Sequence, residues 1–303
     1  MAPRQGGKLK KGESDRNRAT IAVIGGSGLY EMDGLTDVEE VRVKTPFGDP
    51  SDAIVLGTLE GRRVAFLPRH GRGHVIAPTE IPARANIYAL KSLGVERIIS
   101  VNAVGSLQKG IRPLDMVIPD QVIDRTKSRV NSLFEGSGVV VHCSFADPFC
   151  GDLSGLLYRA AQRTHSRAHL GGTYIAMEGP LFSTRAESEM YRSLGGSVIG
   201  MTVLPEAKLA REAEMCYASL SCSTDYDCWH PEHDDVTVEM VISNLQENVV
   251  AAKDVLRRLI AKLPEERTCD CASALEYAIV TARDSIPART KRDLALLLGK
   301  YVQ

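Results

Sequence analysis

Short apolar runs alternate along the chain with longer segments in which apolar residues recur every three or four positions. The short runs predict buried β-strands, and the longer spacing predicts amphipathic helices. The strands are expected at residues 20–24, 53–56, 62–67, 97–101, 115–118, 139–143, 173–177, 198–201 and 216–223. The helices are expected at residues 79–93, 153–164, 184–194, 205–214, 236–263 and 287–298. Strands that alternate with helices in this way predict an α/β fold with buried strands.

The patterned part of the chain contains neither an internal repeat nor a Pro/Gly/Ser-rich linker. One domain over residues 19–303 is therefore expected, preceded by a disordered basic tail over residues 1–18. The leucine-rich segment 287–299 predicts a terminal helix. Because an apolar helix at a chain end needs a surface to cover, this helix is expected to pack on its own core or on a neighbouring subunit.

Charge and cysteine content exclude several classes of protein. The 303 residues include 37 Lys and Arg against 38 Asp and Glu, a formal net charge of -1, which argues against a nucleic-acid-binding protein held by its overall field. No apolar window of about 18 residues predicts a membrane span, and no apolar stretch of a signal peptide follows the basic N-terminus. Seven cysteines, an odd number, fit reduced thiols, so a cytoplasmic location is expected.

The pair Cys269 and Cys271 leaves two interpretations open. Two cysteines one residue apart could form a strained, redox-active disulfide, or they could remain free thiols. The sequence contains no second CxC or CxxC motif, so its spacing does not support a zinc site. A second group of potential metal ligands also lacks a recognised spacing. Its members are Asp225, Asp227, Cys228, His230 and His233. No metal is therefore expected.

Three segments at the ends of predicted strands carry groups that bind anions. The Gly-Gly-Ser-Gly turn around Ser27 offers backbone N–H groups and a hydroxyl. The segment 68–74 holds two arginines and two histidines, a cationic cluster suited to phosphate. The small residues at 102–106 predict another turn. Since ligands of open α/β sheets bind in a crevice at the strand ends, these segments are expected to face the same ligand.

Two further segments carry side chains suited to an organic ligand. Phe182 could stack on a planar ring, whereas Ser183 and Thr184 could simply cap the next helix. Asp225 and Asp227 follow a buried strand, where carboxylates are costly unless they have partners. Such a pair suggests an acid–base or hydrogen-bonding site. A nicotinamide-dependent oxidoreductase is disfavoured, because the glycine-rich turn lacks the third glycine of the dinucleotide fingerprint.

Five motifs in this order resemble the purine nucleoside phosphorylase superfamily, over residues 21–263. They are Gly-Gly-Ser-Gly-Leu at 25–29, Thr-Pro-Phe-Gly at 45–48, Arg-His-Gly at 69–71, Glu-Gly-Pro-x-Phe-Ser at 178–183 and Thr-Asp-Tyr-Asp-Cys-Trp at 224–229. The resemblance implies a single-domain mixed β-sheet flanked by helices. It also implies a homotrimer or a dimer of trimers, which would give the terminal helix a partner.

The function that the resemblance implies is phosphorolysis of S-methyl-5'-thioadenosine to adenine and 5-methylthioribose 1-phosphate, in purine and methionine salvage. Inorganic phosphate is the nucleophile and co-substrate, so neither a nucleophilic side chain nor a cofactor is needed. By the same resemblance, phosphate binds to Ser27, Arg69, His70, the backbone of Ala103, and Thr202. Asp225 falls where the family protonates or hydrogen-bonds N7 of the purine, and Asp227 falls where it binds the 6-amino group.

The resemblance implies the remaining substrate contacts as well. They fall on Phe182, Ser183, Met201, His74, Val238, Val241 and, from an adjacent subunit, His142 and a leucine near 296–298. An ionised carboxylate only accepts hydrogen bonds, so two aspartates favour adenine, whose 6-amino group donates, over 6-oxopurines. The alternatives are a 6-oxopurine nucleoside phosphorylase, a methylthioinosine phosphorylase and a nucleoside-binding protein without catalysis.

Overall fold

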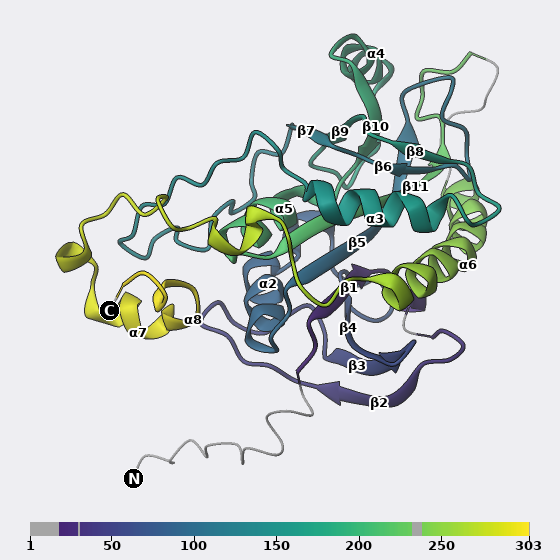
Figure 1. Cartoon of the computed structure of the whole chain (residues 1–303). Coiled ribbons are helices and arrows are strands. Elements are labelled where there is room, and N and C mark those ends of the chain that lie inside the picture. The colour runs from purple at the N-terminus through teal and green to yellow at the C-terminus, as the bar shows by residue number, and fades with distance from the viewer. Residues whose placement is uncertain (1–17, 30, 232–237, 303) are drawn as a thin grey trace.

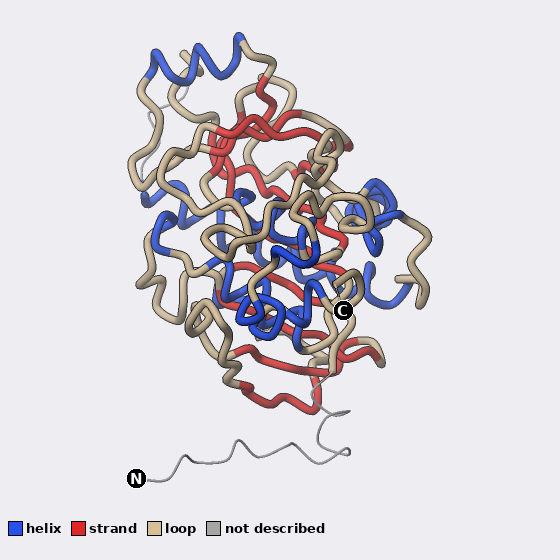
Figure 2. Tube along the Cα trace, turned by 90° about the vertical axis from the view of Figure 1, so that its left-hand side faces the viewer, coloured by secondary structure: helices blue, strands red, loops and turns tan. Residues whose placement is uncertain are grey.

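The structure, a computed structural model, describes residues 18–29, 31–231 and 238–302, while the side chains of Ser27 and of residues 238–242 lie outside what it describes. The tail predicted over residues 1–18 therefore falls, except for Arg18, outside the described residues. Eleven strands form one mixed sheet, and helices flank it (Figure 1). Figure 2 shows the strands lying one above another through the molecule. The predicted α/β fold with a mixed sheet is confirmed.

The centre of the sheet is parallel. β1 (Ile21–Gly25) runs parallel to β4 (Arg62–Pro68) on one side and to β5 (Arg97–Ser106) on the other. β11 (Cys216–Asp225) runs parallel to β5 in turn. Every residue of β1 and β11 is buried, as expected for strands covered on both faces. The carboxyl ends of these four strands therefore meet at one edge of the sheet.

Antiparallel strands extend the sheet beyond β4. β3 (Ile54–Leu59) pairs with β4 as an antiparallel hairpin, and β2 (Thr36–Val41) pairs with β3 at the edge. The hydrophobic pattern missed β2 because none of its residues is buried. An edge strand of this kind is held by its backbone ladder and by surface contacts such as the Arg63–Glu39 pair, so it leaves no clear apolar signature.

The other side of the sheet is built from short strands. β10 (Gly196–Gly200) pairs antiparallel with the end of β5, and β9 (Thr173–Ala176) and β7 (Gln121–Asp124) follow it. On the side of β11, β6 (Met116–Ile118) pairs antiparallel with β11, and β8 (Ala168–Leu170) pairs parallel with β6. β7 and β8 were missed by the pattern, since their side chains are exposed or half-buried.

Two segments differ from their predicted structure. Residues 102–106 are not a turn: they continue β5, because β11 and β10 both supply backbone partners there. Residues 139–143 are not a strand, and only the single bridge Val141–Ile279 forms in that segment. Their backbone instead meets a late loop of the chain, where the His142 N–H donates to the carbonyl of Ala278.

Four helices cover the two faces of the sheet. α3 (Gly151–Ala161) and α6 (Val238–Lys262) pack on one face, with the side chains of Ile21 and Val23 in the same core cluster. α2 (Ala83–Ser92) and α5 (Val203–Glu212) pack on the other face, with Ala22 and Ile24. The alternation along β1 shows that successive side chains point to opposite faces, so the sheet has two hydrophobic cores.

The C-terminal segment forms two short helices in place of the predicted single one. α7 (Ala288–Asp293) and α8 (Ala295–Leu298) are separated by Leu294, whose φ of -109° is not helical. Leu297 and Leu298 are buried in the core of their own chain, whereas Leu296 is exposed. The expected packing of this segment is therefore met largely within the chain. None of the helices in the described part of the chain combines the length and apolarity that a bilayer crossing needs.

Candidate functional site

A pocket of about 400 Å³ opens at the carboxyl ends of β1, β4, β5 and β11. It is lined by Gly26 and Gly28 after β1, and by Arg69 and His70 after β4. Residues 101–105 of β5, residues 199–202 at the end of β10, and Asp225 complete much of the wall. Segments far apart in the sequence therefore face one cavity, as expected for an open α/β sheet.

Arg69 carries a buried positive charge at the edge of this pocket. Its guanidinium pairs with Glu206 of α5, with Nε donating to Oε1 at 2.5 Å and Nη2 to Oε2 at 3.2 Å. Nη2 also donates to the Ser100 hydroxyl, and Nη1 donates to the carbonyl of Val101 at 3.1 Å. Burial opposes the charge, but the Glu206 carboxylate outweighs it and raises the pKa of Arg69. Most donors of Arg69 are thus used by the protein, and the guanidinium is a fixed charge at the pocket wall.

His70 is neutral in this setting. Burial, followed by the charge of Arg69, lowers its pKa to about 4. Its Nδ1 lies 2.8 Å from the carbonyl of Ile76, which assigns the proton to Nδ1. Nε2 is then an acceptor, so His70 can accept a hydrogen bond from a protonated phosphate or a sugar hydroxyl. The ring stacks on His74, with centroids 4.2 Å apart.

Thr202 offers the pocket an unused hydroxyl. Its Oγ1 is buried and makes no hydrogen bond of normal geometry among the described residues, although the Tyr174 hydroxyl lies beside it, and Thr202 lines the pocket. A buried hydroxyl without a partner costs free energy unless a ligand or water satisfies it. Ala103 lines the same cavity from β5. Gly26 and Gly28 flank Ser27 there, but the Ser27 side chain lies outside the described residues.

Asp225 is buried at the end of β11 and held by two donors. The Thr224 hydroxyl donates to its Oδ2 at 2.6 Å, and the backbone N–H of Asp227 donates to its Oδ1 at 2.8 Å. Burial raises the pKa of Asp225 despite these hydrogen bonds. A Cβ at Gly105 would lie 2.8 Å from Asp225 Oδ1, so a glycine in β5 makes room for this carboxylate.

Asp227 turns a carboxylate oxygen toward the pocket. Its Oδ2 is buried and makes no hydrogen bond of normal geometry among the described residues. Burial raises the pKa of this group too, although the nearby hydroxyls of Ser188 and Ser183 oppose the rise. The residue has φ of 51°, a left-handed conformation in which asparagine and aspartate are enriched. Both aspartates line the pocket. Two carboxyl groups with raised pKa values in one cavity are typical of acid–base or hydrogen-bonding roles.

Only some of the other predicted contact residues lie in the pocket. Phe182, Met201 and His74 line the pocket, and Phe182 is half exposed. Ser183 does not line it: its hydroxyl lies 3.8 Å from the sulfur of Met177. His142 is exposed in the segment that meets the late loop and is not part of this chain's pocket. The side chains of Val238 and Val241 lie outside the described residues.

The two groups of potential metal ligands named from the sequence lie in different arrangements. His233 lies outside the described residues, and the other four candidates there do not form a group close enough to share an ion. Cys269 and Cys271, in contrast, lie beside Cys150 and Cys216, with all four sulfur atoms within 4.8 Å of one another. The sequence spacing could not reveal this cluster, because its members come from distant segments.

Comparisons with known proteins agree with this architecture. The sequence profile of the phosphorylase superfamily matches residues 20–261. The chain belongs to the phosphorylase superfamily. It is 59% identical to the S-methyl-5'-thioadenosine phosphorylase of Geobacter sulfurreducens, over 93% of this chain and 99% of that protein. It is 58% identical to that of Koribacter versatilis, over 94% and 97%.

Solved structures of the superfamily share the fold. A methylthioadenosine phosphorylase from an antarctic soil metagenomic library superposes with a TM-score of 0.89 at 51% identity, covering 93% of this chain and 99% of that one. The Schistosoma mansoni methylthioadenosine phosphorylase in complex with adenine superposes with a TM-score of 0.79 at 33% identity, covering 93% and 98%. The resemblance predicted from five short motifs is therefore confirmed.

Sequence reasoning missed the residues that support this phosphorylase pocket. Glu206 pairs with Arg69 and holds its guanidinium in place, and Arg129 donates to the carbonyls of Met201 and Glu178 in two segments of the pocket wall. Asn244 of α6 donates to the carbonyl of residue 224 and Asn248 to that of residue 223, just before Asp225. The sequence carries no distinct signal for Glu206, Asn244 and Asn248, because α5 and α6 hold several other polar side chains.

Proposed function

We propose that this protein catalyses the phosphorolysis of S-methyl-5'-thioadenosine to adenine and 5-methylthioribose 1-phosphate. The observation that carries the proposal is one pocket that joins a buried cation to two carboxyl groups with raised pKa values. β4 and β11 are three strand spacings apart in the order β4-β1-β5-β11, which is roughly 14 Å. That span suits a phosphate and a nucleoside bound in line between Arg69 and Asp225.

The phosphate end of the pocket needs charge and donors but no nucleophilic side chain. Arg69 supplies a fixed positive charge, and the free hydroxyl of Thr202 supplies a donor. Neutral His70 accepts, through Nε2, a hydrogen bond from the protonated oxygen of a phosphate monoanion or from a ribose hydroxyl. Holding phosphate against the anomeric carbon makes its attack effectively intramolecular, which accounts for much of the rate enhancement.

The purine end of the pocket must stabilise the departing base. A raised pKa increases the fraction of Asp225 that is protonated near neutral pH, so Asp225 is suited to donate a proton to N7. The Oδ2 of Asp227 accepts a hydrogen bond from the 6-amino group. The relatives named as S-methyl-5'-thioadenosine phosphorylases support this choice of substrate.

Adenine release by the purified protein tests this function. We expect the protein to release adenine from S-methyl-5'-thioadenosine only when phosphate is present, with the products separated by chromatography. Asp225→Asn removes the proton donor and should lower kcat/KM for this substrate by about 100-fold or more. With methylthioinosine the same variant should lose much less, because a 6-oxopurine presents a different set of hydrogen-bonding groups.

An exposed aspartate provides the control. Asp254→Asn changes the same side-chain chemistry on α6, where Asp254 pairs with Arg258 at the surface, and should leave kcat/KM unchanged. Equal release of adenine without phosphate would indicate a hydrolase and contradict the proposal. Binding of the nucleoside without release of adenine would indicate a non-catalytic nucleoside-binding protein.

We further propose a homotrimer in which His142 of one subunit completes the substituent pocket of the next. Support comes from exposed apolar side chains beside His142, among them Val140, Tyr277 and Val280, because large exposed apolar patches mark interfaces. A cytoplasmic location is proposed as well. It is supported by seven cysteines that are all free, which suits a reducing compartment.

A further inference from the structure

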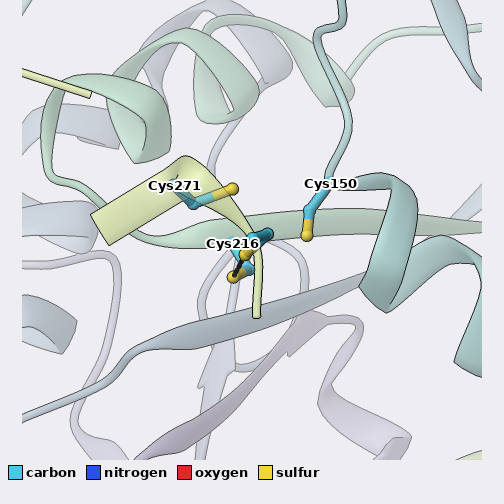
Figure 3. Close-up of side chains that lie close together, drawn as sticks. Cys150, Cys216 and Cys271 are labelled. Carbon is cyan, nitrogen blue, oxygen red and sulfur yellow. Dashed lines mark hydrogen bonds between the residues drawn. The ribbon is translucent and has the colours of Figure 1, made fainter. Parts of the chain in front are cut away.

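We propose that Cys150, Cys216, Cys269 and Cys271 form a structural Zn²⁺ site with four thiolate ligands. Their sulfur atoms all lie within 4.8 Å of one another, and in the described residues no other set of three or more potential ligands is so close. Figure 3 shows Cys150, Cys216 and Cys271 pointing toward one another from three separate segments. The site is distinct from the pocket that holds Asp225.

The spacing of the sulfur atoms fits one ion at their centre. Tetrahedral zinc with Zn–S bonds of about 2.3 Å places its sulfur ligands about 3.8 Å apart. In the structure Cys216 Sγ lies 3.3 Å from Cys269 Sγ, and the widest separation stays within 4.8 Å. Small side-chain rotations bring these distances to the tetrahedral value. Four protein ligands leave no open position for water, which is typical of structural rather than catalytic zinc.

The backbone holds the four ligands in place. The Cys150 N–H, just before α3, donates to the carbonyl of Tyr217, and the Cys216 N–H donates to that of Glu96. Cys269 and Cys271 belong to the short helix η3 (Asp270–Ser273) and the residue before it. Cys150, Cys216 and Cys271 are buried, and Cys269 is half-buried, so an ion can enter from the side of Cys269. Preorganised and largely buried thiols favour soft metal ions.

The position of the cluster indicates its role. The chain that leaves α6 is held by Arg97, which donates to the carbonyls of Glu265 and Glu266. The next residues carry Cys269 and Cys271, so an ion would join this segment to β11 and α3. Cys216 and Asp225 stand at opposite ends of β11, roughly 30 Å apart at about 3.3 Å per residue. The ion would therefore fix the C-terminal segment and take no part in the chemistry at Asp225.

Binding releases the thiol protons and involves no oxidation. The thiols lose up to four protons to solvent as four Zn–S bonds form, and zinc stays Zn²⁺ throughout. The competing chemistry is oxidation to disulfides within the same cluster, which would remove its ligands. Metal content and disulfide content are thus opposite outcomes for one set of residues.

Metal analysis of the full chain tests the proposal. The reduced protein is incubated with ZnCl₂ and desalted. It should then retain about one zinc per chain, measured by elemental mass spectrometry. Cys271→Ser removes a ligand and should weaken zinc retention at least about tenfold in competition with a chromophoric chelator.

Cys143→Ser is the matched control, because Cys143 is a half-buried thiol outside the cluster. It should retain zinc as the unmodified protein does. Cobalt in place of zinc should give the intense visible bands of a tetrahedral tetrathiolate site.

A second variant guards against a folding defect. Cys269→Ser changes the half-buried ligand, so it should fold while also losing zinc, and a chelator should lower the Tm of the unmodified protein but not of this variant. Zinc retention that is equal in all variants would overturn the proposal. So would iron in place of zinc, or disulfides among these four cysteines, with no bound metal, in protein isolated without reductant.

Discussion

Glu206 has a strong influence on the site, although the sequence analysis did not predict it. Arg69 and Glu206 are each only 3% exposed at their side chains. The hydroxyls of Ser100 and Tyr217 also donate to Glu206, so its carboxylate organises a buried polar network. A buried ion pair adds little stability relative to an apolar replacement, but removal of one partner leaves the other charge unpaired. Glu206 therefore controls both the charge and the position of Arg69.

Glu206→Gln should destabilise the protein by about 3–5 kcal/mol, because it leaves the Arg69 charge buried without its counter-ion. It should also raise the KM for phosphate, since Gln holds the guanidinium less firmly. Denaturant unfolding measures the first effect, and adenine release at varied phosphate concentration measures the second. The control is Glu39→Gln, which breaks the surface pair with Arg63 and should cost less than about 1 kcal/mol. Equal stability losses in both variants would contradict the role of Glu206.

At the scale of the element, α4 (Arg185–Ser193) links helix capping to the pocket. The Thr184 hydroxyl accepts the Glu187 N–H, and the Glu187 carboxylate accepts the Thr184 N–H at 2.8 Å. This capping box satisfies two backbone donors that the helix leaves unpaired. Thr184 follows Phe182 by two positions, so the same cap fixes the loop that brings Phe182 to the pocket.

Thr184→Ala should lower the free energy of local opening of α4 by about 1 kcal/mol, which corresponds to roughly fivefold faster amide exchange in its first turn. The KM for the nucleoside should rise with it, as the Phe182 loop loses its anchor. Hydrogen exchange and steady-state kinetics check the two effects. Ser193→Ala at the other end of α4 removes a hydroxyl that donates to the Met190 carbonyl, and it should change neither. Unchanged exchange in Thr184→Ala would show that the cap does not limit opening.

Sequence patterns predicted the buried elements well and the rest poorly, for a physical reason. β1 and β11 are covered on both faces, so their apolar runs identify them. β2 and β7 are exposed or half-buried and were missed. Residues 139–143 are apolar enough for a strand, but tertiary hydrogen bonds place them against a late loop. A local sequence pattern carries no information about such long-range partners. For the same reason it did not predict that Glu206 pairs with Arg69 or that Cys150 lies beside Cys271.

At the scale of the whole molecule, one strand joins two separate functions. β11 ends at the pocket with Asp225 and begins at the cysteine cluster with Cys216. Its neighbours β5 and α6 run along it, so the sheet is a rigid support between them. Because the two sites stand at opposite ends of β11, a substitution at the cysteine cluster is expected to leave the chemistry at Asp225 unchanged.

The apolar surface beside His142 is where we expect subunits to assemble. Val140 is 51% and Val280 62% exposed, and the N–H of Val280 donates to the carbonyl of Val140 at 2.9 Å. Burial of such apolar area drives association, so Val280→Glu should convert the proposed trimer to monomers in light scattering coupled to gel filtration. The KM for S-methyl-5'-thioadenosine should rise in parallel, because each pocket would lose the His142 that a neighbour supplies. Val38→Glu is the control, since Val38 is similarly exposed on β2 at the far edge of the sheet, and it should remain trimeric. A monomeric unmodified protein, or a trimer that survives Val280→Glu with unchanged KM, would contradict an interface at this surface.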